Sequence, residues 1–270
     1  MIRNEGDRLR RVVVCTPDKE YFDVDDIVAH NMNEIADPNL TREQHDGLKS
    51  IFREAGCEVI DVPELGGHPN SAFVRDVSLV TPEGYVKVRM GLPTRRGEEE
   101  WMSQILESMG ERCVGEITEP GTVEGGDVIL AGPVAFVGHS CRTNEEGVGQ
   151  LSAVLGDMGY EVRVVPVGDD FMHIGGIMSS IGPRRVLCCR ELFPDGFFDG
   201  FDTVDIRYIN PSSGNVICIG ENEVIANAAE SAETIRVLEE EGVTVHAINL
   251  SEFRKGAGGP SCLTLPLERR

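Results

Sequence analysis

The sequence repeats one pattern in which a helical stretch ends at a glycine and a short strand follows at once. Four stretches end in this way, at Gly56, Gly110, Gly159 and Gly242. Glycine accepts the left-handed backbone that commonly closes a helix, so it is a physical stop signal. The intervals between these glycines are 54, 49 and 83 residues. The long interval predicts a further, degenerate unit formed by the strand-like segments 176–182 and 184–192.

A pair of short strands joined by a turn precedes each helix. Such pairs occupy 77–90, 128–139 and 216–227, and the segment 11–17 begins the first unit. The unit is therefore strand, strand, helix, strand, five times over, and units of this size cannot each bury their own core. We expect an α/β fold, a five-fold pseudo-symmetric α/β propeller of ββαβ units closed around a central axis. No linker or shift in composition divides the chain, which predicts a single domain over residues 1–270.

Polar residues stand just before the first strand of each unit. They are Asp76, Glu124 to Asp127, His173, Asn215 and Cys262. In a closed ring these strand starts meet at one end of the axis. The sequence therefore predicts that carboxylates, an imidazole, an amide and a thiol share one small volume.

Each of these residues also has a purely structural interpretation. Asp76 and Asp127 are residue types that cap turns, and Gly125-Gly126 could simply turn the chain. A single histidine such as His173 is more often a satisfied core residue, and most cysteines pack as small apolar side chains. Cys262, however, follows Ala257-Gly-Gly-Pro-Ser261, where glycines let the backbone approach a ligand closely. Taken together at equivalent repeat positions, the set favours function.

Charge and cysteine usage restrict the partners. The formal charge is −21, from 46 acidic and 25 basic residues, and it disfavours nucleic acid and anionic lipid while attracting a small cation. Solubility is the alternative cause of this acidity. No apolar run has the length of a membrane span, and the first residues contain no signal-peptide-like stretch. Eight cysteines, mostly in apolar strands, predict a reduced, cytoplasmic protein, and the absence of Cys-x-x-Cys and His-x-x-x-His pairs argues against a zinc site.

The chemistry that suits this set is an attack on a planar cation. Carboxylates that face a thiol raise its pKa unless a cation lies between them. A guanidinium fits that gap, because carboxylates hold it by paired hydrogen bonds and present its carbon to the sulfur of Cys262. His173 can then protonate the departing nitrogen and afterwards activate water.

Five segments resemble a known superfamily. They are Arg89-Met-Gly-Leu-Pro-Thr-Arg-Arg-Gly-Glu98, Pro120-Gly-Thr-Val-Glu-Gly-Gly-Asp127, Ser140-Cys-Arg-Thr-Asn-Glu-Glu-Gly147, Met172-His-Ile174 and Gly258-Gly-Pro-Ser-Cys262. In this order they are similar to the guanidine-modifying superfamily with the five-bladed α/β propeller, or pentein, fold. The likeness covers nearly the whole chain and is strongest to the dimethylarginine dimethylaminohydrolases.

The resemblance implies a role for each matched residue. Cys262 resembles the nucleophile that forms a covalent thiouronium intermediate, and His173 the general acid and base. Glu124 resembles the carboxylate that pairs with the guanidinium and orients the histidine. The further substrate-binding residues implied are Asp76, Arg89, Arg142, Asn70, Arg75 and Asp127, with Arg89 and Arg142 matching the arginines that grip the α-carboxylate. The resemblance implies no metal and no organic cofactor.

Some positions depart from the dimethylarginine pattern. Asn70 and Arg75 stand where that subfamily has Asp and Glu, and Asn-x-x-x-x-Arg-Asp resembles the arginine deiminases. The segment Leu263–Arg269 resembles them too. Conversely, the pattern typical of the deiminases is His-x-Asp, and this chain has Gly175 at the position of that Asp. The deiminases also carry a helical insertion that this chain length does not accommodate.

We therefore expect a hydrolase that converts an Nω-methylated L-arginine into L-citrulline and an amine. Arginine deimination is the nearest alternative, followed by an amidinotransferase and by a non-catalytic propeller that binds a partner. A dihydrolase is disfavoured, because the pattern typical of that branch has Asn at the position that matches Asp76. The expected partner is a small guanidino cation, and the chain could act as a monomer or a homodimer.

Overall fold

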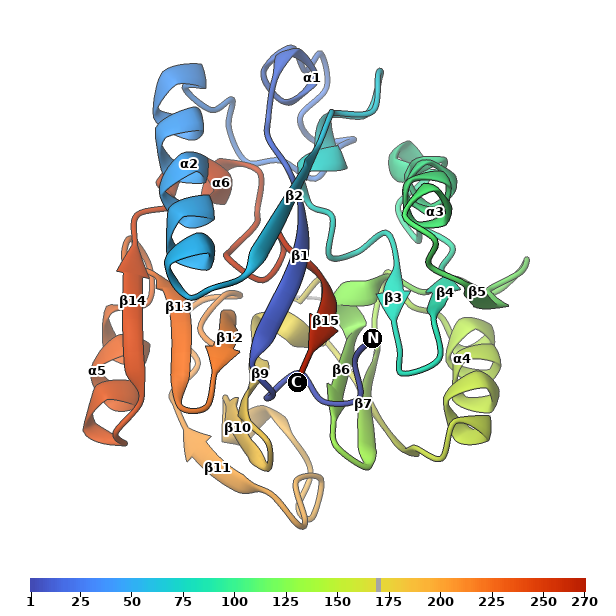
Figure 1. The fold of residues 1–270 in the computed structure, drawn as a ribbon, viewed down its shortest axis with the longest axis vertical. Helices are drawn as coiled ribbons and strands as arrows, with labels where there is room; N and C mark the ends of the chain where they lie inside the picture. Colours follow the sequence, from blue (N-terminus) through green and yellow to red (C-terminus); the bar gives the residue numbers. More distant parts are fainter. Residues whose placement is uncertain (169–170) are drawn as a thin grey trace.

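Five three-stranded sheets surround a central axis in this protein, whose computed structural model describes residues 1–168 and 171–270 (Figure 1). The sheets are, in the order of their strands, β15(Leu265–Arg269)-β1(Leu9–Cys15)-β2(Glu58–Val62), β3(Leu79–Val80)-β4(Tyr85–Lys87)-β5(Cys113–Glu116), β6(Val128–Ala131)-β7(Val134–His139)-β8(Glu161–Pro166), β9(Met178–Gly182)-β10(Arg185–Cys188)-β11(Asp202–Asp205) and β12(Val216–Gly220)-β13(Glu223–Asn227)-β14(Thr244–Ile248). The predicted α/β propeller with five-fold pseudo-symmetry is confirmed.

Within each sheet the first two strands pair antiparallel and the last two pair parallel. A parallel pair needs a crossover, and in four units an α-helix provides it. These helices are α2(Pro38–Glu54), α3(Glu98–Ser108), α4(Glu145–Asp157) and α5(Ala232–Glu240). Two short helices, α1(Lys19–Phe22) and α6(Ser251–Lys255), lie in connecting segments.

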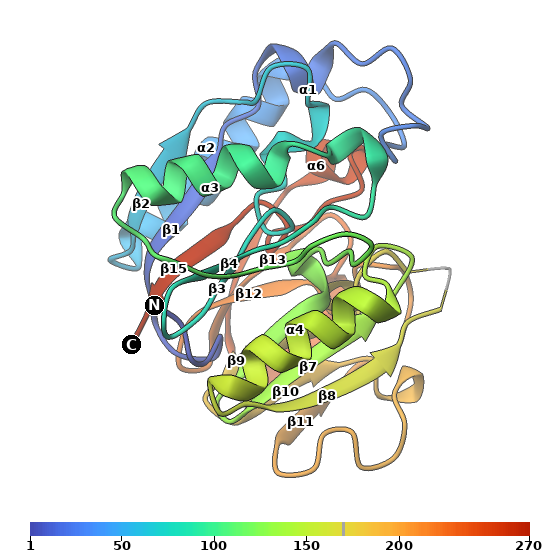
Figure 2. The same ribbon diagram turned by 90° about the vertical axis from the view of Figure 1, so that its right-hand side faces the viewer.

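The two ends of the chain close the ring. The last strand, β15, pairs antiparallel with β1, so that Val13 lies opposite Leu265. The termini accordingly lie close together in both views (Figures 1 and 2). Cys262 thus precedes the first strand of a unit that the N-terminal segment completes.

The unit around β10 departs from the pattern, because no α-helix forms between β10 and β11, where every residue is described. A 3-10 turn at Arg190–Leu192 and an irregular segment take its place. Pro194, Gly196 and Gly200 disfavour a helix there. Phe193, Phe197 and Phe198 cover the sheet instead and pack against Phe136 of the neighbouring unit.

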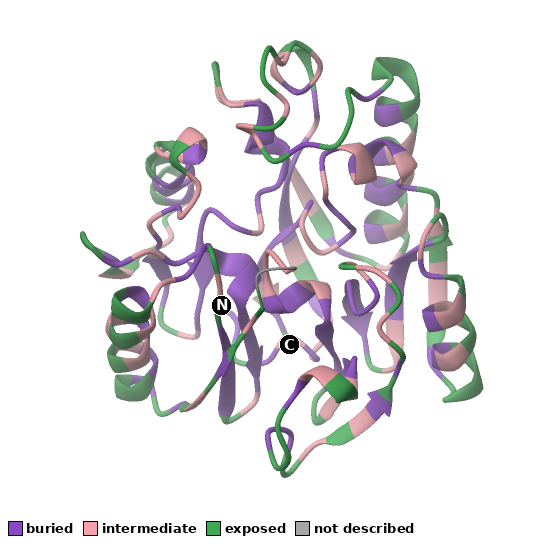
Figure 3. Ribbon diagram, turned by 180° about the vertical axis from the view of Figure 1, so that it is seen from behind, coloured by how far each residue is buried: buried purple, intermediate pink, exposed green. Residues whose placement is uncertain are grey.

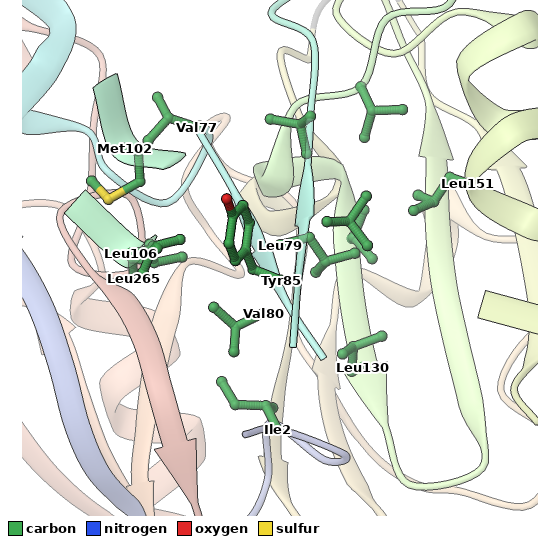
Figure 4. Packing of buried hydrophobic residues seen from close by; sticks show 14 of the residues in the cluster. Ile2, Val77, Leu79, Val80, Tyr85, Met102, Leu106, Leu130, Leu151 and Leu265 are labelled. Carbon is green, nitrogen blue, oxygen red and sulfur yellow. The ribbon is translucent and has the colours of Figure 1, made fainter. Parts of the chain in front are cut away.

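The helices lie outside the ring and expose their outer faces, whereas the inner strands are buried (Figure 3). All four helix-closing glycines have the left-handed backbone expected of them, with φ of 77° at Gly56, 82° at Gly110, 82° at Gly159 and 77° at Gly242. Buried apolar side chains fill the space between sheets and helices. In one cluster Tyr85 and Leu265, from two different sheets, pack with Leu106 of α3 (Figure 4).

Among the described residues no helix combines the length and the apolar character that crossing a bilayer requires.

Candidate active site

The starts of the inner strands meet at one end of the axis, and a hydrogen bond joins each to the next. At four of the five junctions both partners belong to the predicted set or directly adjoin a member of it. The donors and acceptors are Arg75 N–H to Cys262 O at 3.1 Å, Gly125 N–H to Asp76 O at 2.8 Å, Ile174 N–H to Asp127 Oδ1 at 3.0 Å, Gly214 N–H to Gly176 O at 2.9 Å, and Ser261 N–H to Asn215 Oδ1 at 3.2 Å. The structure therefore places the predicted residues in one hydrogen-bonded ring.

Glu124 and His173 occupy equivalent positions in neighbouring units. Each has an extended backbone and directly precedes a 3-10 turn, at Gly125–Asp127 and at Ile174–Gly176. Their side chains meet, with His173 Nε2 2.8 Å from Glu124 Oε2. The other oxygen of Glu124 accepts the backbone N–H groups of Gly91 at 3.0 Å and Leu92 at 3.1 Å. These bonds fix the carboxylate and thereby aim the imidazole.

The two groups shift each other's pKa in opposite directions. Burial lowers the pKa of His173, but Asp76 and the hydrogen bond to Glu124 raise it more, to about 9. Burial raises the pKa of Glu124, but His173, Arg95 and Arg142 together lower it to about 2. At neutral pH the pair is therefore an ionised carboxylate and an imidazolium, which is the form that can act as a general acid.

Asp76 is the second carboxylate of the site. Its Oδ2 accepts a hydrogen bond from Arg95 Nη1 at 2.6 Å, and its Oδ1 lies 3.8 Å from His173 Nδ1. Oδ1 is buried and has no hydrogen-bond partner among the described residues. A Cβ at Gly126 would come within 2.6 Å of this oxygen, so only glycine allows the two strand starts to approach so closely.

Cys262 lies across from these carboxylates. Its Sγ accepts a hydrogen bond from Asn215 Nδ2 at 3.4 Å, and its N–H donates to Gly259 O at 3.1 Å. Burial raises the pKa of the thiol and Asp76 raises it further, against smaller opposing effects of Gly259, Asn215 and Ser261. This is the direction expected for a thiol that is buried and faces a carboxylate.

Two cavities meet at Cys262 and His173. The smaller, of 30 Å³, is lined by Asp76, Glu124, Asn70, Arg95 and Arg142 besides these two residues, and we call it the acidic pocket. The larger, of 240 Å³, includes Arg75, Asn215, Ser179 and Arg269 in its lining, and we call it the axial cavity.

Asp76, Glu124 and His173 could also offer ligands to a metal ion, because one atom of each lies within 4.8 Å of the others. Buried guanidinium groups already neutralise these carboxylates, since Arg95 bonds Asp76 and Arg142 Nη1 lies 3.6 Å from Glu124. A further dication would be repelled by both arginines and by a protonated His173. The donor set therefore favours a planar monocation over a metal.

The predicted substrate-gripping arginines differ in position. Arg142 lines the acidic pocket, whereas Arg89 points to Gly121 O at 3.2 Å and to the exposed Glu119 at 3.5 Å. The position of Arg89 does not support the role expected for it. The backbone of Arg89 bridges to Val123, the residue before Glu124, but the sequence does not determine which way the long side chain of Arg89 turns.

Arg75 and Asp127 also make contacts that differ from the expected role, whereas Asn70 lines the acidic pocket. Arg75 lies in the axial cavity and donates to Glu5 Oε1 at 2.8 Å. Asp127 lies behind His173, where it accepts from Ser140 Oγ at 2.6 Å and from Ile174 N–H. Burial raises the pKa of Asp127 to about 6. These contacts favour structural roles for Arg75 and Asp127.

Sequence reasoning missed Arg95 and left Asn215 without a role. Arg95 is 4% exposed and bonds Asp76. Three further hydrogen bonds fix the Arg95 guanidinium itself, to Glu98 at 2.8 Å and to the carbonyls of Phe73 at 3.0 Å and Asn70 at 3.4 Å. The sequence signal for Arg95 is its spacing to Glu98, which follows three residues later. Both lie in the segment Arg89–Glu98 that resembles the superfamily, and this spacing suits an ion pair at the start of a helix.

Comparison with known proteins agrees with this geometry. Residues 62–194 and 199–269 match the sequence model of the arginine deiminase family. The chain belongs to the arginine deiminase family. It is 29% identical to the N(G),N(G)-dimethylarginine dimethylaminohydrolase of Pseudomonas aeruginosa, over 83% of this chain and 87% of the relative. It is also 31% identical to an uncharacterized protein of Aeropyrum pernix, over 80% of each chain.

Solved structures show the same fold. A variant of the Pseudomonas aeruginosa dimethylarginine dimethylaminohydrolase, in which serine replaces a cysteine, is complexed with citrulline and superposes with a TM-score of 0.84 at 25% identity. The match covers 96% of this chain and 100% of that one. The chain is accordingly a pentein-fold enzyme of the class of hydrolases that act on carbon–nitrogen bonds in amidines.

Proposed function

We propose that this protein hydrolyses the guanidino group of an Nω-methylated L-arginine to L-citrulline and methylamine or dimethylamine. The observation that carries the proposal is Oδ1 of Asp76, which has no partner among the described residues 1–168 and 171–270 and is buried in the acidic pocket with Glu124 and Cys262. A buried acceptor without a partner is costly unless a ligand satisfies it. The N–H groups of a guanidinium are donors of the required charge and shape.

In the first step the Cys262 thiol releases its proton to solvent as the cationic substrate binds, and the thiolate Sγ attacks the guanidinium carbon. The sulfur–carbon bond forms, the bond from carbon to the methylated nitrogen breaks, and that nitrogen leaves as an amine with a proton from His173. Glu124 and Asp76 hold the remaining nitrogens. The imidazolium at His173 supplies the proton at neutral pH because its pKa is raised to about 9.

In the second step water replaces the amine. His173, now neutral, takes a proton from the water as its oxygen bonds to the thiouronium carbon. The sulfur–carbon bond then breaks, its electron pair returns to Cys262, the hydroxyl proton passes to the resulting thiolate, and a ureido group remains on the product. The axial cavity of 240 Å³ adjoins both residues and can supply this water.

Arg142 is the arginine that we propose to bind the α-carboxylate, because it lines the acidic pocket, as Asn70 also does. The other contacts of the Arg142 guanidinium are long, at 3.6 Å to Glu124 and 3.7 Å to Met172 Sδ, so its donors can serve a ligand. The negative formal charge of −21 suits a cationic substrate.

The methylated substrate is favoured by the backbone at Gly175. A Cβ there would lie 2.9 Å from Gly126 O, so an acidic residue would need the backbone to move. The acidic pocket therefore gains no acceptor from this position. A dimethylated nitrogen has no N–H to satisfy, and the adjoining axial cavity gives room for its methyl groups.

Arginine deimination, which yields L-citrulline and ammonia, is the second candidate. It is supported by the match to the arginine deiminase family and by Asn70, which lines the acidic pocket with its amide instead of a carboxylate.

We further propose that residues 1–270 act as one catalytic unit, since β15 and β1 from the two ends share a sheet. It would act in the cytoplasm as a monomer or homodimer.

A substrate panel tests the proposal. The protein is incubated with arginine, monomethylarginine, asymmetric dimethylarginine and agmatine, and ureido product and released amine are measured. Faster turnover of a methylarginine supports the proposal, and preference for arginine supports deimination. Product that forms only when glycine or ornithine is added as acceptor would indicate an amidinotransferase, and no product from any guanidine would indicate a non-catalytic propeller.

A further inference from the structure

Asn215 precedes β12 and reaches between the strand start that carries His173 and the turn that carries Cys262. Its side chain is buried, and two backbone groups fix its orientation. Oδ1 accepts the N–H of Ser261 at 3.2 Å, and Nδ2 donates to the carbonyl of Gly175 at 3.2 Å. Turning the amide over would place oxygen against oxygen and NH₂ against N–H, so one orientation is strongly preferred.

In that orientation Nδ2 also faces the nucleophile. It lies 3.4 Å from Cys262 Sγ, which leaves one N–H for the sulfur and one for the carbonyl of Gly175. Gly259 makes this approach possible, since a Cβ there would come within 2.5 Å of Asn215 Oδ1. The glycines that precede Cys262 thus make room for an amide that holds the thiol.

Asp127 makes the corresponding contact two junctions earlier in the ring. Its Oδ1 accepts the N–H of Ile174, the residue after His173, as Asn215 accepts the N–H of Ser261, the residue before Cys262. At both positions a buried polar side chain fixes the backbone next to a reacting group. Only Asn215 also has a donor for that group.

The sulfur has charged neighbours of both signs. Asp76 raises its pKa, and the half-buried guanidinium of Arg75 lines the axial cavity together with Cys262. Glu124 and the imidazole of His173 line the same acidic pocket. A neutral N–H donor near the sulfur favours the thiolate without repelling a cationic substrate, which a lysine or arginine at this position would do.

We propose that Asn215 is a positioning residue for Cys262, whose amide fixes the sulfur opposite the acidic pocket and stabilises the thiolate. The thiolate forms before attack and again when the thiouronium breaks down, so the same hydrogen bond serves both steps. The part of the inference that concerns turnover rests on the proposed function. The part that concerns the thiolate does not.

The test is the pH dependence of alkylation at Cys262 by iodoacetamide, read by peptide mass spectrometry so that the other cysteines do not contribute. Asn215→Ala removes the donor, and Asn215→Asp replaces it with a carboxylate oxygen of similar shape. We expect the midpoint of the profile to rise by about one pH unit in Asn215→Ala, which is about tenfold slower alkylation at neutral pH. It should rise further in Asn215→Asp.

Asn227→Asp is the matched control. Asn227 is buried to the same 3% exposure and precedes the turn after β13, but its Oδ1 accepts the N–H groups of Ala229 and Leu250 while its Nδ2 has no partner among the described residues. A carboxylate can keep both bonds there. We expect an unchanged alkylation midpoint in this variant.

A thermal melt first shows whether each Asn215 variant is folded. The proposal would be overturned if a folded variant had the same alkylation midpoint as the unaltered protein. A kcat that stays within about twofold in both variants would also overturn the role in turnover, since a lost hydrogen bond to a charged group costs about tenfold or more. If the proposed function fails, the unaltered protein shows no turnover, but the alkylation profiles still decide the role of Asn215.

Discussion

Replacing Glu124 by glutamine removes one charge while keeping the shape of the side chain. Glu124 Oε1 accepts two backbone N–H groups, from Gly91 at 3.0 Å and Leu92 at 3.1 Å, so the glutamine carbonyl must take that place. The amide NH₂ then faces His173 Nε2, which lies 2.8 Å from the carboxylate. A ring nitrogen can accept that hydrogen bond only when it carries no proton. The variant therefore favours neutral His173.

The size of the effect follows from the pKa of His173. A full return from about 9 to the ordinary 6.5, which Asp76 opposes because it also raises this pKa, corresponds to about 3 kcal/mol. At pH 7.5 the protonated fraction would drop from nearly all to about a tenth, which costs roughly tenfold in the step that needs the acid. Loss of a charged hydrogen bond to the guanidinium costs about tenfold or more besides. We expect kcat/KM to fall by at least about a hundredfold.

The assay is kcat/KM between pH 5 and 10, with an NMR titration of the His173 ring and a thermal melt. Glu99→Gln is the control, because Glu99 is also buried and accepts the backbone N–H of Gly97 at 2.8 Å. It should retain activity. If folded Glu124→Gln kept a His173 pKa near 9, or lost less than about threefold in kcat/KM, the electrostatic account of the pair would be wrong.

Three further predictions follow from contacts around the site. Arg142→Ala should raise KM at least about tenfold in steady-state kinetics, because the Arg142 guanidinium faces the acidic pocket. Arg89→Ala should change KM less than about threefold, and equal effects of the two substitutions would contradict this assignment. Arg75→Met should lower the free energy of unfolding by about 3 kcal/mol in urea titrations, because it leaves the half-buried carboxylate of Glu5 without its cationic partner. Glu5→Gln should restore part of the loss, and additive losses would contradict a direct pair. Burial raises the pKa of Asp127 to about 6, so the folded protein favours the protonated carboxyl and loses stability as pH rises through 6. Asp127→Asn should therefore be more stable than the unaltered protein at pH 8 but not at pH 4, and a pH-independent difference would refute the titration.

The repeat could be predicted from the sequence because its signals are local. Glycine at a helix end needs only its own backbone conformation, and Gly56, Gly110, Gly159 and Gly242 all adopt it. Once five units are recognised, closure alone brings Asp76, Glu124, His173, Asn215 and Cys262 to one end of the axis. That part of the candidate site follows from symmetry.

Side-chain contacts between distant segments could not be predicted in this way. Arg75 turns to Glu5, a residue 70 positions away in the N-terminal segment, and not to the acidic pocket. Arg95 reaches the pocket and Arg89 does not, although both lie in one matched segment. The rotamer of a long cationic side chain depends on partners that only the folded chain supplies.

The most direct test of the account is the covalent state of Cys262 during turnover. Protein mixed with isotopically labelled asymmetric dimethylarginine is quenched in acid, digested and analysed by mass spectrometry. The account predicts an adduct on the Cys262 peptide that keeps the amino-acid carbon skeleton and has lost dimethylamine, and no adduct in Cys262→Ser. An adduct that contains only the amidino carbon would mean that the other nitrogen leaves, and label on another residue or on none would contradict Cys262 as the nucleophile.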